Sequence, residues 1–231
     1  MSCIHTYMLV FSHTSLYQLP MHVLIIIICF ITALLAKLQK DPPRYLNSFI
    51  VYILVTIIVE VVAWWYSIHN KRNLIFYNLY AIINFTYLIF LLRSFMTNAR
   101  MVSVMGVLMF AYPVLALINL LLIQGTNTIF NTYTFLSGCI IIVTASVCYF
   151  YERIKYPGPH SLLKEPAFWV STGLLFFYTC SPPLTGVVNA ISLMPFYNLK
   201  TLYFINLMVN IILYLLFSIS FICNLIFRRY S

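Results

Sequence analysis

Glu60 is a carboxylate inside an otherwise apolar stretch, VTIIVEVVAWW (55–65), in a chain that has only four acidic residues. Placing an ionisable side chain inside a membrane span costs roughly 2.5–3.5 kcal/mol on insertion scales, and such residues often mark binding sites or ion pathways. Two interpretations are open. Glu60 either anchors a ligand or a proton, or it is a neutral carboxyl that hydrogen-bonds to a neighbouring helix.

Other polar side chains recur at helical spacing and form candidate partners for Glu60. Thr56 precedes it by one turn on the same helical face, and the rise of a helix places Glu60 about 10 Å below the end of its segment. Asparagine and tyrosine also bridge helices in a purely structural way. The predicted ligand pocket, in the outer half of the membrane, is lined by Glu60, Thr56, Tyr80, Asn84, Tyr112, Asn206, Asn210 and Tyr214.

A proline pair, Pro182-Pro183, interrupts the apolar segment FFYTCSPPLTG (176–186). Proline lacks an N–H and clashes with preceding carbonyls, so the carbonyls of Tyr178 and Thr179 lose their helical partners. The pair predicts a kink or an unwound turn that faces the bundle interior or a wet cavity. It acts as a hinge, or it is a static kink that shapes packing.

The longest charged stretch is YERIKYPGPHSLLKEPAFW (151–169), which is either a docking surface for a partner or a solvated connector. No phosphate-binding loop, HExxH or GxSxG motif is present. Glu60 stands as a lone carboxylate, without a nearby His, Asp or metal partner in the sequence, and hydrolysis needs such a partner. We therefore expect no enzymatic activity, no cofactor and no metal.

The composition identifies the environment of these residues. The chain of 231 residues is 63% hydrophobic and 7% charged, whereas ordinary globular domains carry about 25% charged residues. Such a chain cannot cover a water-facing surface with charge, so the sequence predicts an integral membrane protein that contacts the lipid bilayer. The net charge of +9 is scattered among short segments, which argues against nucleic-acid binding.

A membrane-spanning helix needs about 20 mostly apolar residues, and the chain holds seven candidate segments. Short polar breaks separate them and leave no room for a soluble domain. The predicted fold is therefore a single all-α domain, 1–231, with seven transmembrane helices. The expected spans are 21–37, 46–67, 73–93, 101–123, 131–151, 167–190 and 201–227.

The basic residues predict the orientation of the bundle. When the seven segments alternate, ten of the 13 Lys and Arg residues fall on one side, and Lys71, Arg72 and Lys200 fall on the other. Positive charge stays cytoplasmic. The N-terminus is therefore expected outside the cell and the C-terminus inside.

Three stretches, 75–92, 125–152 and 162–183, carry a family resemblance that covers most of residues 45–227. With the motifs FNTYT (130–134) and EPxFWxSxGxLxFY (165–178), they resemble a group of small seven-helix bacterial inner-membrane proteins of uncharacterised function. Similar helix sets precede the kinase modules of some histidine-kinase sensors. The resemblance implies a fold and a location in the bacterial inner membrane, and it assigns no catalytic residue.

Two functions follow from these observations. The first is a membrane-embedded sensor or accessory signalling subunit that binds a small molecule or lipid in the outer pocket. It would relay the change through 151–167 and the C-terminus to a separate protein partner, or act as a homo-oligomer. The alternative is a transporter, channel or pore-forming effector, with Glu60 as the ion site and the Pro182-Pro183 break as the gate.

Overall fold

The computed structural model describes residues 21–38, 44–69, 74–123, 131–157, 161–190 and 196–227. In these ranges the regular structure is entirely helical, which confirms the all-α class. Each of the seven expected segments corresponds to one helix. The helices are α2 (Met21–Lys37), α3 (Arg44–Ile68), α4 (Leu74–Phe95), α5 (Ala99–Ile118), α6 (Thr132–Lys155), α7 (Pro166–Ala190) and α8 (Phe196–Phe227), with the π-helical turn η1 (Asn119–Ile123) after α5 and the short 3-10 turn η2 (Leu162–Lys164) before α7.

Five helical stretches in these ranges are long and apolar enough to cross a membrane: Tyr45–Tyr66, Leu74–Phe95, Ala99–Ile123, Thr132–Lys155 and Phe204–Ile226. Helix α2 is also apolar but has 17 residues. Many large apolar side chains on the outer surfaces of the helices are exposed, as expected where lipid rather than water surrounds a bundle. These lengths and this composition are those of a multi-pass membrane protein.

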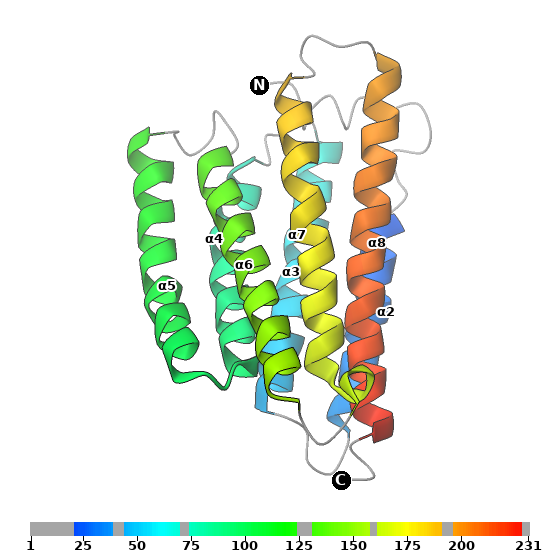
Figure 1. Cartoon of the computed structure of the whole chain (residues 1–231). Helices are drawn as coiled ribbons and strands as arrows, with labels where there is room; N and C mark the ends of the chain where they lie inside the picture. Colours follow the sequence, from blue (N-terminus) through cyan, green and yellow to red (C-terminus); the bar gives the residue numbers. More distant parts are fainter. Residues whose placement is uncertain are drawn as a thin grey trace.

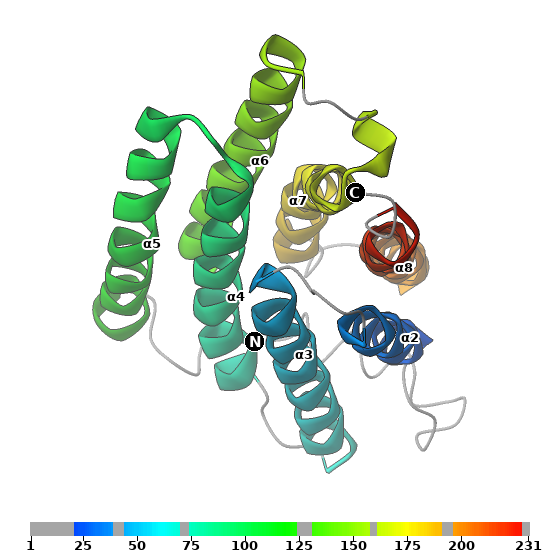
Figure 2. The same cartoon turned by 90° about the horizontal axis from the view of Figure 1, so that it is seen from below.

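Successive helices run in opposite directions along the long axis of the molecule (Figure 1). Six of them close a ring in the order α2, α3, α4, α6, α7 and α8, with α8 packed against α2 (Figure 2). We call the end where α2 begins the His22 end, and the end where α6 finishes the Glu152 end. This ring decides which polar residues meet inside it.

Helix α5 lies outside the ring and packs mainly against α4 (Figure 2). Only 17% of its most apolar 18-residue stretch is buried inside the bundle, compared with 39% for α4. Its first turn is capped by Asn98, whose side chain accepts a hydrogen bond from the Arg100 amide at 3.0 Å. The sequence does not distinguish this peripheral helix from the others, because it is as apolar as they are.

Aromatic side chains fill the ring. Phe85 on α4 is fully buried, and its ring centroid lies 5.7 Å from that of Tyr112, 5.5 Å from that of Phe135 and 5.2 Å from that of Tyr178. Gly138 on α6 allows this arrangement, because a Cβ at that position would lie 2.6 Å from the Phe85 ring. Helices α4 and α6 therefore approach each other closely at one glycine.

Helix α7 continues through the proline pair without an unwound turn, from Pro166 to Ala190. Of the two alternatives, the unwound turn is therefore wrong, and the kink stays a prediction. Two prolines remove only two backbone donors, and the turns on either side keep their own hydrogen bonds. Nearby hydroxyls bond within the helix as well: Ser181 Oγ donates to the Phe177 carbonyl at 2.8 Å.

Candidate functional site

A chain of buried hydrogen bonds links three helices inside the ring. The Tyr52 hydroxyl on α3 donates to Asn84 Oδ1 on α4 at 2.7 Å. Asn84 Nδ2 then donates to the Tyr178 hydroxyl on α7 at 2.8 Å. The three side chains are at most 8% exposed. The side-chain amide of Asn84 therefore accepts one hydrogen bond and donates another away from solvent.

Thr56 extends this chain toward the His22 end. Its Oγ1 lies 2.9 Å from the Tyr52 carbonyl and 2.8 Å from the Tyr80 hydroxyl. A threonine hydroxyl has one hydrogen, which it donates to the carbonyl, so Tyr80 must be the donor to Thr56. We call Tyr52, Thr56, Tyr80, Asn84 and Tyr178 the tyrosine network.

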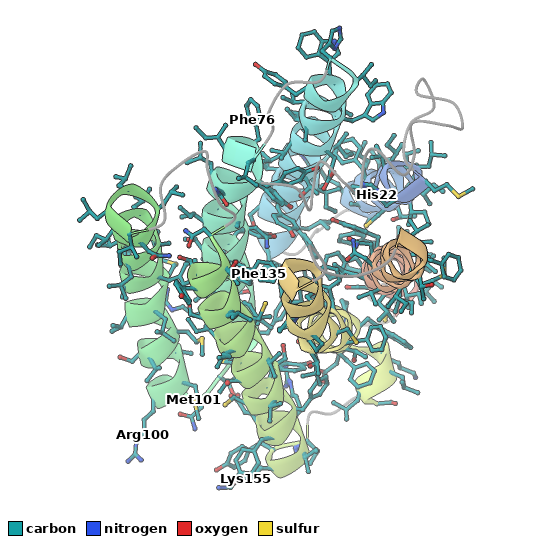
Figure 3. All side chains as sticks on the ribbon, turned by 90° about the horizontal axis from the view of Figure 1, so that it is seen from above. His22, Phe76, Arg100, Met101, Phe135 and Lys155 are labelled. Carbon is teal, nitrogen blue, oxygen red and sulfur yellow. The ribbon has the colours of Figure 1, made fainter. Side chains whose placement is uncertain are left out.

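Glu60 lies one turn beyond Thr56 on α3 and contacts a histidine. Its Oε2 is 3.3 Å from His22 Nε2 on α2, and the two side chains are 21% and 23% exposed. Tyr77 on α4 lies close enough to interact with the same carboxylate. Figure 3 shows His22 on α2, at the end of the bundle nearer the viewer. Glu60, His22 and Tyr77 form a partly accessible polar site that continues the tyrosine network.

The pairing with His22 corrects the interpretation of Glu60 as a lone carboxylate. The two residues are 38 positions apart, and only the packing of α2 beside α3 brings them together. The site therefore combines an imidazole and a carboxylate on two neighbouring helices. No group of three or more His, Cys, Asp or Glu residues that would suit a metal ion occurs in the part of the chain that the structure describes.

The remaining predicted pocket residues divide into two groups. Tyr214 on α8 is buried and lies within electrostatic range of Tyr80 and Glu60, so it faces the same interior. Tyr112 lies behind Phe85, where its hydroxyl donates to the Thr134 carbonyl on α6 at 3.2 Å. Its position is in the contact between α5 and α6 rather than in the ring.

Asn206 and Asn210 form hydrogen bonds within α8. Asn210 Nδ2 donates to the Asn206 carbonyl at 2.8 Å, and Asn206 is exposed. The structure therefore places both residues on α8 without bringing either into the tyrosine network. Both residues belong to the predicted pocket, but the rotation of α8 in the ring leaves Asn206 exposed on the outside.

An apolar layer closes the ring below the tyrosine network, toward the Glu152 end. The Phe49 ring lies 5.0 Å from those of both Phe217 and Phe221, centroid to centroid. Tyr52 stacks on Tyr87 at 4.5 Å just above it. The side chains that form this apolar layer are at most 1% exposed: Ala33, Phe49, Leu88, Val170, Leu174, Phe217 and Phe221. The polar interior is therefore bounded on one side.

A second polar cluster joins α5 to the ring near the His22 end. Asn119, at the start of η1, donates to Thr134 Oγ1 at 2.8 Å and also to Asn131 Oδ1. The backbone N–H of Asn131 donates to Asn78 Oδ1 on α4 at 3.0 Å. Sequence reasoning missed this cluster, although the motif FNTYT (130–134) contains two of its members.

Carboxylates also organise the Glu152 end. Glu152 is buried on α6 and accepts hydrogen bonds from the Thr97 amide, at 2.7 Å, and from the Thr97 hydroxyl. Glu165, just before α7, pairs with Arg153 Nε at 3.2 Å and accepts from the Tyr149 hydroxyl at 3.4 Å. The charged segment is thus attached to the bundle by its own side chains.

The turn η2 is in turn attached to helices α7 and α8. Trp169 Nε1 donates to the Leu163 carbonyl at 2.9 Å, and Ser220 Oγ on α8 donates to the Pro166 carbonyl at 2.9 Å. These contacts give the motif EPxFWxSxG a structural explanation. Glu165 fixes the start of α7 against α6, Trp169 fixes it against η2, and Ser220 fixes it against α8.

Replacing Asn84 with leucine tests the tyrosine network. The change removes two hydrogen bonds, each worth about 0.6 and at most about 1.7 kcal/mol between membrane helices. We expect a loss of about 1–2 kcal/mol in the free energy of unfolding, measured by titration with sodium dodecyl sulfate in mixed micelles. Asn210→Leu is the matched control, and equal losses in both variants would contradict a network that joins three helices.

Comparison with known proteins gives no relative for this arrangement. No protein-family model, curated protein or solved structure matches the chain. The function must therefore be argued from the site itself.

Proposed function

We propose that this chain is a membrane-embedded sensor or accessory signalling subunit that binds a small molecule or lipid at Glu60, His22 and Tyr77. It would cross a bacterial inner membrane seven times, with the N-terminus outside and the C-terminus inside. The observation that supports the proposal is that the tyrosine network reaches the His22 end of the bundle, while an apolar layer separates it from the polar side chains at the Glu152 end. The tyrosine network begins at the partly exposed Glu60–His22 pair and stops at the apolar layer around Phe49.

The chemistry of the site favours a ligand with a cationic or hydrogen-bond-donating group. Glu60 is the acidic side chain of this site, and Tyr77 and Tyr80 lie within electrostatic range of it. A ligand that bonds to Glu60 would compete with His22 and Tyr77 for the carboxylate. It can shift the bundle only if it binds one arrangement of the helices more tightly than the other.

The tyrosine network provides a route from this site to α7. Tyr80 donates to Thr56, and Asn84 bonds to Tyr178. Pro182 leaves the Tyr178 carbonyl without its helical donor. A change in the network would therefore act on the weakest turn of α7. The opposite end of α7 begins beside Glu165 and Arg153, where a separate protein partner or a second copy of this chain would read the change.

A transporter or pore is the second candidate function, and the His22–Glu60 pair favours it. A titratable pair inside a helical membrane protein is also what proton-coupled transport requires. In that case, the apolar layer would be a closed gate and the Pro182-Pro183 pair its hinge. This function requires proton or solute flux across a liposome membrane, which a sensor would not produce.

Native mass spectrometry of the protein, extracted gently from its own membrane, tests the proposed sensor. We expect one small ligand bound per chain in the wild type and none in Glu60→Gln, because the amide removes the negative charge that anchors the ligand. Glu165→Gln is the chemically matched control at the opposite end and should retain the ligand. A ligand retained by Glu60→Gln, or an empty wild-type protein, would contradict the proposal.

A further inference from the structure

Arg93 carries a positive charge near the end of α4 and extends across to α5. Its Nε donates to the Val102 carbonyl at 3.1 Å. The guanidinium lies over Gly106, where a Cβ would be 3.6 Å from Cζ and from Nη2. Nε makes the one hydrogen bond found for this side chain among the residues that the structure describes. The donors on Nη1 and Nη2 are therefore available to an anion.

The guanidinium lines an open groove of about 230 Å³ between α4 and α5. Its lining consists of Phe90, Arg93, Ser94, Met96 and Val102. All five belong to these two helices or to the turn that joins them, so the groove faces away from the ring. Arg93 is the charged residue of this lining, and no acidic residue in it neutralises the guanidinium.

The groove lies near the end of α4, and the ends of a membrane-spanning helix lie at the level of the phospholipid headgroups. Arg93 is two residues before the end of α4, which corresponds to about 3 Å along the helix. Phe90, one turn further into the apolar part of α4, is 38% exposed. A molecule seated here would meet a cation at one end and an apolar wall toward the membrane centre.

We propose that this groove binds one anionic phospholipid, in the leaflet at the Glu152 end. The phosphate would accept hydrogen bonds from the Arg93 guanidinium, which presents several donors in a fixed planar geometry suited to phosphate. One acyl chain would lie against Phe90 and Val102. The site is independent of Glu60 and of the proposed sensor function, and it would help to hold the peripheral helix α5 against α4.

Lipid titration of the purified protein, followed by native mass spectrometry, tests this site. The probes are phosphatidylglycerol and a diacylglycerol with the same acyl chains but no phosphate. We expect the wild type to bind one phosphatidylglycerol about tenfold to a hundredfold more tightly than diacylglycerol, as for a charge-assisted hydrogen bond. Arg93→Met should abolish this difference. Arg100→Met removes an equal charge from an exposed side chain of α5 outside the groove lining and should preserve it (Figure 3).

Two further measurements keep the result interpretable. If Arg93→Met does not fold, Ser94→Phe fills the groove from an exposed position, keeps the charge, and should weaken phosphatidylglycerol binding at least about tenfold. Inorganic phosphate at millimolar concentration should not displace the lipid. Unchanged lipid preference in the folded groove variant, or displacement by inorganic phosphate, would overturn the proposal.

Discussion

Replacing Gly138 with alanine is expected to destabilise the bundle by about 1–3 kcal/mol, which is the usual effect of forcing an extra methyl group into a packed core. The new Cβ would lie 2.6 Å from the Phe85 ring. That ring cannot retreat easily, because Tyr112, Phe135 and Tyr178 surround it. Helices α4 and α6 would have to separate, which would also disturb the hydrogen bond between Asn84 and Tyr178.

Unfolding of purified protein by sodium dodecyl sulfate in mixed micelles, followed by tryptophan fluorescence, measures this effect. Gly106→Ala is the matched control, since a Cβ there meets Arg93 at an ordinary contact distance of 3.6 Å. We expect it to change stability by less than about 1 kcal/mol. Phe85→Leu should partly rescue Gly138→Ala. Equal stability of the two alanine variants would show that the close approach of α4 and α6 is not a constraint.

Phe49→Ala is expected to make the protein leaky to protons, whereas the wild type should be tight. Phe49 is fully buried between the rings of Phe217 and Phe221. Removing its ring leaves a cavity below Tyr52, where water can reach the tyrosine network from the Glu152 end. The stability loss should not exceed about 3–5 kcal/mol, the range for such truncations in soluble proteins.

Liposomes that contain the purified protein and an entrapped pH-sensitive dye measure this leak after a pH step. Phe49→Leu retains most of the volume and should remain tight. The experiment also separates the two candidate functions. Rapid proton flux through the wild type would favour the transporter, and a tight Phe49→Ala variant would show that the apolar layer is not the barrier.

Much of the fold follows from local sequence. The two boundaries of α2 and the C-terminal ends of α7 and α8 agree with the apolar segments to within a few residues. In lipid, backbone groups must form hydrogen bonds within the protein, and a helix satisfies them within one segment. The orientation stays a prediction, since the structure contains no membrane. The side chains of Lys71, Arg72 and Lys200, on which it partly rests, lie outside the described residues.

The candidate site was only partly predictable. Thr56, Tyr80 and Asn84 were identified from their spacing on α3 and α4, and the structure joins them in one network. His22 was missed as the partner of Glu60, because nothing local in the sequence indicates which helix packs beside α3. The hydroxyl of Tyr178 was missed for the same reason.

The sequence by itself determined the membrane environment, the number and extent of the apolar segments, and the polar positions inside them, because each of these depends on local composition and helical period. The tertiary structure decided which of those positions meet. It placed α5 outside the ring, turned Asn206 away from the interior, and set His22 against Glu60. Those outcomes depend on the order and rotation of the helices. Close contacts such as Gly138 against Phe85 set that order and rotation. Hydrophobicity does not set them, because lipid and the protein interior are equally apolar.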